Sequence, residues 1–144
     1  MPADEKVLEV VREWAQKADN DLRNASYTLT MPEDCPTDTV CFHAQQCVEK
    51  YLKAMLTLLE VDYPQTHSVD MLLMLIPSEK RPMLSTEEQD RLTEYATVTR
   101  YPGDYDPIPL TEAEKAVSMA HRVRDDTRSM LPANALPRET EEIM

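Results

Sequence analysis

The hydrophobic and polar positions between Val40 and Leu59 predict an amphipathic helix. The stretch contains no glycine or proline, and its apolar residues recur three and four positions apart, which places most of them on one broad arc. The opposite side carries His43, Gln46, Lys50, Lys53 and Thr57. A third, mixed strip consists of Phe42, Gln45, Glu49 and Leu56. The broad arc predicts contact with the core of the chain. The mixed strip carries a phenylalanine that we expect to be exposed, and it therefore predicts contact with a partner.

The same spacing predicts four further helices, which prolines and short polar segments separate. Two starts fit a capping box, in which a serine or threonine is followed three positions later by a glutamate: Ser85 with Glu88, and Thr111 with Glu114. The other helices are predicted over residues 4–29, from a cap at Thr66 or Ser68 to Ile76, over 85–100 and over 111–131.

The composition agrees with a helical protein. The chain has 144 residues, enough for one domain with a core, and glycine occurs only once. We therefore predict an all-α, up-and-down bundle of about five helices over residues 1–131. Residues 132–144 are polar, acidic and interrupted by prolines, and we expect them to form a disordered tail.

Charge and cysteine usage limit the classes of function. The net charge is −12, so the chain has no general attraction to nucleic acid, and any RNA contact must be local. No apolar run is long enough to span a membrane, and the acidic start does not resemble a signal peptide, which predicts a cytoplasmic protein. Cys35, Cys41 and Cys47 are too few and poorly spaced for a disulfide framework or a zinc site, and we expect free thiols.

Three motifs resemble the HEPN domain family (higher eukaryotes and prokaryotes nucleotide-binding). They are FHAQQCVEKYLKA over 42–54, Thr66 with His67, and Arg100-Tyr-Pro, and the resemblance extends from about Val7 to Leu131. It implies a helical bundle that is usually a homodimer. Many HEPN proteins are metal-independent ribonucleases, often the toxin of a toxin–antitoxin pair, with a minimal nucleotidyltransferase as partner. Others are inactive bundles that bind a nucleotide or a partner.

The family's ribonuclease motif is an arginine followed, after four to six residues, by a histidine. Arg100 matches the arginine, but Tyr105, Asp106 and Pro107 occupy the positions where the histidine is expected. A tyrosine with an ordinary pKa near 10 is a poor base at neutral pH. Arg100 is a candidate to bind a phosphate, or it pairs with a nearby aspartate at a helix end. Tyr105 is a candidate proton carrier or modification site, or it packs in its loop.

The basic side of the second helix supplies further candidates. His43 is a possible substitute for the missing histidine, and Lys50 and Lys53 are possible phosphate ligands beside it. The alternative is a histidine that packs at an interface and fixes a neighbouring loop. Asp104 and Asp106 lack a third fixed ligand, so we predict neither a metal nor a cofactor.

These observations leave three hypotheses. In the first, the chain is a homodimeric HEPN binding module for a nucleotide or a minimal nucleotidyltransferase. In the second, it is a metal-independent ribonuclease toxin that uses Arg100 with His43 or Tyr105 as an unusual proton carrier. In the third, it is a purely structural dimer. The acidic charge and the missing histidine favour the first.

Overall fold

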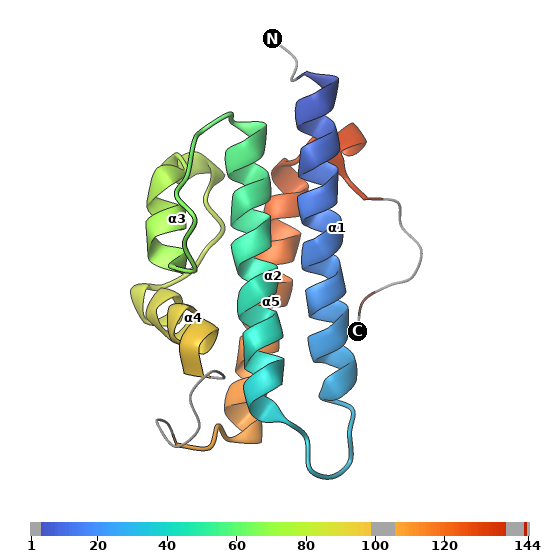
Figure 1. The fold of residues 1–144 in the computed structure, drawn as a ribbon, viewed down its shortest axis with the longest axis vertical. Helices are drawn as coiled ribbons and strands as arrows, with labels where there is room; N and C mark the ends of the chain where they lie inside the picture. Colours follow the sequence, from blue (N-terminus) through green and yellow to red (C-terminus); the bar gives the residue numbers. More distant parts are fainter. Residues whose placement is uncertain (1–3, 99–105, 138–142, 144) are drawn as a thin grey trace.

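The chain forms a bundle of five α-helices in a computed structural model that describes residues 4–98, 106–137 and 143. α1, α2 and α5 are the long helices, with 24, 22 and 21 residues, and Figure 1 shows them side by side. The helices are α1 (Glu5–Thr28), α2 (Thr37–Leu58), α3 (Val69–Leu75), α4 (Thr86–Val98) and α5 (Leu110–Met130). The chain descends through α1, ascends through α2 and descends in the connection that precedes α3. It then ascends through α3, descends through α4 and ascends through α5 (Figure 1). The predicted all-α, up-and-down bundle is confirmed.

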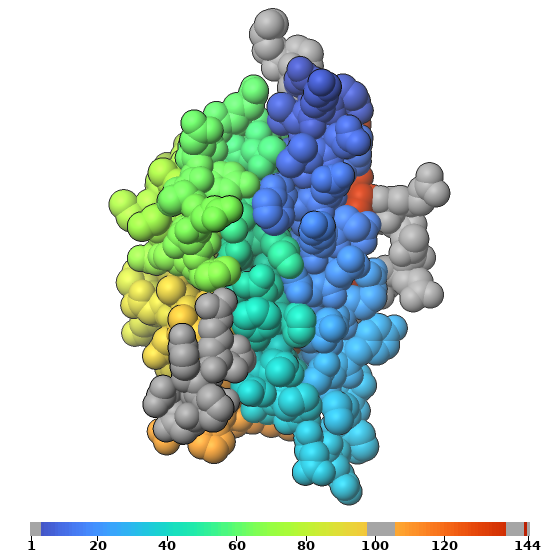
Figure 2. Space-filling view, viewed as in Figure 1, coloured from blue at the N-terminus to red at the C-terminus, as the bar shows by residue number. Residues whose placement is uncertain are grey.

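α2 is the central element, and it packs against all four other helices. Its broad apolar arc is buried from Val40 to Met55, and together with α1 and α5 it forms the core. Figure 2 shows α2 as a band between α1 on one side and the layer of α3 and α4 on the other. A helix covered from several sides is apolar around most of its circumference, which explains its two apolar faces.

Three of the five helix starts have a side-chain cap, whereas α2 and α5 each begin after a proline without one. Asp4 accepts a hydrogen bond from the Lys6 amide and caps α1, and Ser68 caps α3 through the Met71 amide. The capping box of α4 is confirmed by the reciprocal bonds of Ser85 and Glu88, at 2.9 and 3.1 Å. The predicted box at Thr111 is wrong. α5 begins at Leu110, after Pro109, and that start has no side-chain cap.

The end of α2 has an unusual backbone. The Val61 amide donates to the carbonyl of Leu56, and the Glu60 amide donates to the carbonyl of Thr57. These two bonds form a Schellman motif, which places Glu60 in the left-handed region at a φ of 55°. Asp34, shortly before α2, also has a φ of 55°. Glycine is the usual residue at such positions, and aspartate tolerates them, so the conformation is disfavoured at Glu60 in particular.

Helical packing continues past Leu131, where the sequence analysis ended the domain. Ala133–Ala135 forms a 3-10 turn, and Ala135 is fully buried against the core. The Arg12 guanidinium donates to the carbonyl of Asn134 and ties this turn to α1. The first part of the expected tail, up to Pro137, is therefore packed. Residues 138–142 and 144 lie outside the described part of the chain.

The cysteines are all free thiols, as expected. Cys41 and Cys47 are buried on α2, while Cys35 is half-buried before it. Burial raises the pKa of Cys41 to about 12, and the negative charge of Glu112 adds to the effect. Burial also raises the pKa of Cys47, with a further contribution from Asp19. Both buried thiols therefore stay protonated and unreactive at neutral pH.

Candidate functional site

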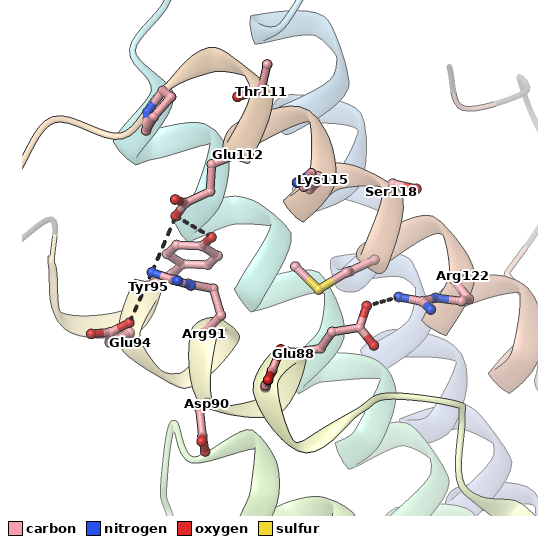
Figure 3. Close-up of a pocket in the computed structure, with 13 residues that line it drawn as sticks. Glu88, Asp90, Arg91, Glu94, Tyr95, Thr111, Glu112, Lys115, Ser118 and Arg122 are labelled. Atoms are coloured by element: carbon pink, nitrogen blue, oxygen red, sulfur yellow. Dashed lines mark hydrogen bonds and ion pairs between the residues drawn. The ribbon is translucent and has the colours of Figure 1, made fainter.

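A groove of about 990 Å³ separates α4 from α5. Its charged lining residues come from both helices, and five of them are carboxylates. They are Glu87, Glu88, Asp90, Arg91, Glu94, Glu112, Lys115 and Arg122. Figure 3 shows Glu88, Arg91 and Tyr95 of α4 on the side that faces α5, whereas Asp90, at the rim of the groove, points away from α5. The two walls differ in charge, because α4 supplies four of the carboxylates and α5 supplies two of the three cations.

One end of the groove is closed by a hydrogen-bonded cluster. The Tyr95 hydroxyl donates to Oε2 of Glu112 at 2.7 Å. Arg91 lies 3.9 Å from the same oxygen and 3.7 Å from a carboxylate oxygen of Glu94 (Figure 3). Burial raises the pKa of Tyr95, and the hydrogen bond to Glu112 raises it further, so the hydroxyl remains protonated as a donor. The cluster joins α4 to α5, and the positive charge of Arg91 is paired with two carboxylates.

The other end is closed by an ion pair between Glu88 and Arg122 (Figure 3). Burial opposes ionisation of Glu88, but the hydrogen bonds from Ser85 and Arg122 outweigh it and lower the pKa of the carboxyl group. Glu88 therefore caps its own helix and binds α5 at the same time. This double role explains why a capping box lies at this point of the sequence.

Other residues that line the groove carry unpaired charges. Glu87 and Asp90 have no hydrogen-bond or ion-pair partner among the described residues, and the same is true of Lys115. Glu94 is 63% exposed and makes only the weak contact with Arg91. The α4 wall therefore presents carboxylates that are available to a ligand.

The predicted catalytic candidate His43 lies elsewhere, between α1 and α2. Its Nδ1 lies 2.9 Å from a carboxylate oxygen of Asp21. The second oxygen of Asp21 accepts a hydrogen bond from Lys50. The three side chains are partly buried, at 29% exposed for His43, 13% for Asp21 and 22% for Lys50. Lys50, a predicted phosphate ligand, is thus already paired with a carboxylate.

The second predicted phosphate ligand, Lys53, belongs to a buried polar network on α2. Glu49 accepts hydrogen bonds from Lys53 at 2.9 Å and from Gln45 at 2.9 Å, and its Oε1 lies 2.8 Å from Nδ1 of His67. Burial would raise the pKa of Glu49, but these hydrogen bonds outweigh it and lower the pKa. The network attaches the connection before α3 to α2, and His67, which sequence analysis placed near the start of the third helix, is part of it.

Lys53 is further enclosed by two aromatic rings. Its Nζ lies 5.5 Å from the centroid of Trp14 and 5.9 Å from that of Tyr63. These distances are typical of cation–π contacts. With a side chain that is only 12% exposed, Lys53 is a structural residue in this structure.

The predicted partner-facing strip is not a surface. Gln45, Glu49 and Leu56 are buried within the chain, at 0%, 3% and 0% exposed, and only Phe42 is partly exposed. The expectation that they face a partner is therefore wrong for three of the four residues. The physical reason is that α3 and α4 also pack against α2 and occupy the space that we had assigned to a partner.

A buried ionic cluster at the centre of the bundle was missed by sequence reasoning. Asp19 on α1 accepts hydrogen bonds from the Tyr51 hydroxyl, from Arg124 at 2.8 Å and from Arg128 at 3.4 Å. Burial raises the pKa of Tyr51, and Asp19 adds to the effect. Only one signal pointed to this cluster: an aspartate at position 19, next to Ala18 and Leu22 of the apolar stripe. The cluster connects α1, α2 and α5.

Two predicted site residues, Arg100 and Tyr105, lie outside the described residues, as does Asp104. Among the residues that the structure describes, no group of three or more metal-ligating side chains comes together. No described helix has both the length and the apolar composition needed to cross a bilayer.

Comparisons with known proteins identify the class to which this helical bundle belongs. The model of the HEPN domain matches residues 11–130, so the chain belongs to the HEPN domain family. TT1696 from Thermus thermophilus has a similar crystal structure, with a TM-score of 0.68 and 27% sequence identity over 84% of this chain and 98% of that one. ST0689, an archaeal HEPN homologue, gives a TM-score of 0.65 and 25% identity over 83% and 96% of the two chains. No curated protein matches the chain.

Proposed function

We propose that this chain is a homodimeric HEPN binding module that engages a partner protein, a minimal nucleotidyltransferase, through the groove between α4 and α5. The observation that carries the proposal is the state of the basic side chains. Lys50 and Lys53, the described cations that sequence analysis assigned to a phosphate, are each paired with a carboxylate. Binding without catalysis is also the simpler role for a chain in which Tyr105 replaces the motif histidine.

The charge of the groove disfavours a phosphate ligand. Arg91 forms ion pairs with Glu112 and Glu94, and Arg122 forms one with Glu88. Lys115 is therefore the unpaired cation among the described lining residues. A nucleotide or an RNA strand would bring more negative charge next to five carboxylates. A protein surface that carries lysine and arginine would instead be attracted to them.

A pair of double variants tests the proposal. Asp90→Lys with Glu94→Lys reverses two charges of the groove, four positions apart on α4. Glu9→Lys with Glu13→Lys makes the same change, with the same spacing, on the outer side of α1. The candidate partner is a minimal nucleotidyltransferase from the same genome, and binding is measured by isothermal titration calorimetry, with masses from light scattering.

We expect the groove variant to weaken the complex by about tenfold or more, because it replaces attraction with repulsion. The α1 variant should change the affinity by less than about twofold. An equal loss in both variants would mean that only the net charge matters, and the groove would then not be the binding site. Failure of the wild-type chain to form any complex would overturn the proposal.

One observation favours a second candidate, the metal-independent ribonuclease. Asp21 holds Nδ1 of His43, so the opposite ring nitrogen is oriented away from that carboxylate, as in a histidine base that a carboxylate positions. This function is tested by RNA cleavage in EDTA with the wild type, Arg100→Ala and His43→Ala. Cleavage by the wild type alone would favour the ribonuclease, and no cleavage by any of the three would favour the binding module.

A further inference from the structure

The groove between α4 and α5 continues toward an exposed methionine. The amide of Met83 donates to Oδ2 of Asp126 at 3.1 Å, which fixes this residue against α5. Asp126 lies one helical turn, about 6 Å, beyond Arg122, the residue that closes this end of the groove. Met83 is 77% exposed, the most exposed of the large apolar residues that the structure describes. The backbone of an exposed apolar residue therefore lies about one helical turn beyond the end of the charged groove.

The carboxylates of the α4 wall have a regular spacing. Glu87, Asp90 and Glu94 are three and four positions apart, so they lie along one face of the helix over about 10 Å. All three line the groove. A second helix lying beside α4, with lysine or arginine at every third and fourth position, would place its cations opposite these carboxylates.

From the charge and the spacing together, we infer that the partner element that occupies the groove is a basic amphipathic helix. Its cations lie against Glu87, Asp90 and Glu94, and an apolar side chain near one end packs on Met83. This inference rests on the proposed function, because it names the chemistry of the element that binds in the same groove. The distance along α5 from Thr111 to Asp126 corresponds to about 22 Å, the length of a helix of about 15 residues.

Other occupants fit these observations less well. A second copy of this chain carries a net charge of −12, so its approach to the acidic α4 wall is opposed by repulsion. RNA would meet the carboxylates with its phosphates. A methionine side chain is flexible and polarisable, and it adapts to apolar groups of different shape. Met83 is thus suited to anchor a partner helix whose register the carboxylates determine.

The test uses two synthetic peptides of the same composition, each about as long as the groove-lining part of α5. In the first, lysine and leucine are arranged on opposite faces of a helix, and in the second the same residues are scrambled. Binding of each labelled peptide to the full chain is measured by fluorescence anisotropy at low and high salt. The protein variants are Met83→Ser and Asp90→Lys with Glu94→Lys.

Met74→Ser is the matched control, because Met74 lies on α3 and is 75% exposed, almost the same as Met83. We expect the amphipathic peptide to bind at least about tenfold more tightly than the scrambled one. Met83→Ser should weaken binding about fivefold and the charge reversal about tenfold or more, while Met74→Ser has no effect.

Equal binding of both peptides, or an unchanged affinity in Met83→Ser, would overturn the inference. Displacement of the peptide by a short single-stranded RNA would overturn it as well, and so would a change of oligomeric mass in Met83→Ser, which would indicate a second copy as occupant. The proposed function fails separately. If the nucleotidyltransferase complex forms and depends on Asp90 and Glu94 while neither peptide binds, the partner docks on the groove by another element and only the inference is lost.

Discussion

Replacing Asp19 by alanine should destabilise the bundle by about 3 kcal/mol, because two arginines would lose their shared carboxylate. The Asp19 side chain is 8% exposed, and Arg124 and Arg128 are 20% and 12% exposed. Removing one partner of a buried ion pair typically costs about 3–5 kcal/mol. The guanidinium groups keep some contact with water, so we expect the lower end of this range.

The assay is urea denaturation, followed by circular dichroism and by the fluorescence of Trp14, the only tryptophan of the chain. With a slope of roughly 2 kcal/mol per molar of urea, the loss corresponds to a midpoint about 1.5 M lower. Each variant is measured at several protein concentrations, because a dimer would make the midpoint depend on concentration.

Two further variants separate charge from packing. Asp19→Asn keeps the size of the side chain and one acceptor oxygen but removes the charge, and it should retain most of the destabilisation. Asp125→Ala removes another carboxylate near Arg124, at 3.8 Å, but the Asp125 side chain is 74% exposed, and the cost should be well under about 1 kcal/mol. A midpoint shift below about 0.5 M for Asp19→Ala, with an unchanged slope, would refute the reasoning.

Two other predictions follow from the titratable groups. In the folded protein at mildly alkaline pH, a thiol reagent should modify Cys35 and leave Cys41 and Cys47 unmodified. In urea, all three thiols should react. Rapid labelling of all three without urea would contradict the burial of Cys41 and Cys47. The Glu49 network should lose stability in acid. Because the folded pKa of Glu49 lies below its ordinary value of 4.5, the unfolded chain takes up the proton first as the pH falls below that value. The difference in unfolding free energy between the wild type and Glu49→Gln should therefore be largest near neutral pH and shrink as the pH falls below about 4; a constant difference across this range would contradict it.

The periodicity of apolar residues was sufficient to predict the helices and the bundle, because each helix has a face that must be buried. It could not say which elements cover α2. From the sequence alone, the mixed strip of α2 resembles a surface that contacts a partner. In the fold, α3 and α4 cover most of this strip, which consists of Phe42, Gln45, Glu49 and Leu56. Burial of polar residues such as Gln45 and Glu49 depends on hydrogen bonds with groups distant in the sequence, and no local pattern reveals them.

The candidate site could likewise not be predicted where it depends on contacts between residues that are distant in the sequence. Sequence analysis found His43, Lys50 and Lys53 but not their partners, because Asp21 and Trp14 lie on another helix. The groove escaped prediction because its acidic wall reads as an ordinary solvated helix face until α5 is placed opposite it. The ion pair of Glu88 with Arg122 joins residues that are 34 positions apart.

The Schellman motif at the end of α2 also has a consequence for evolution and engineering. Glu60 holds a left-handed backbone that costs a residue with a Cβ about 1 kcal/mol more than glycine. The central helix therefore ends where tertiary contacts of Leu56 and Val61 require it, and not where the residue types favour an end. Glu60 is thus a position where we expect a single mutation to glycine to raise the melting temperature without touching the core or the groove.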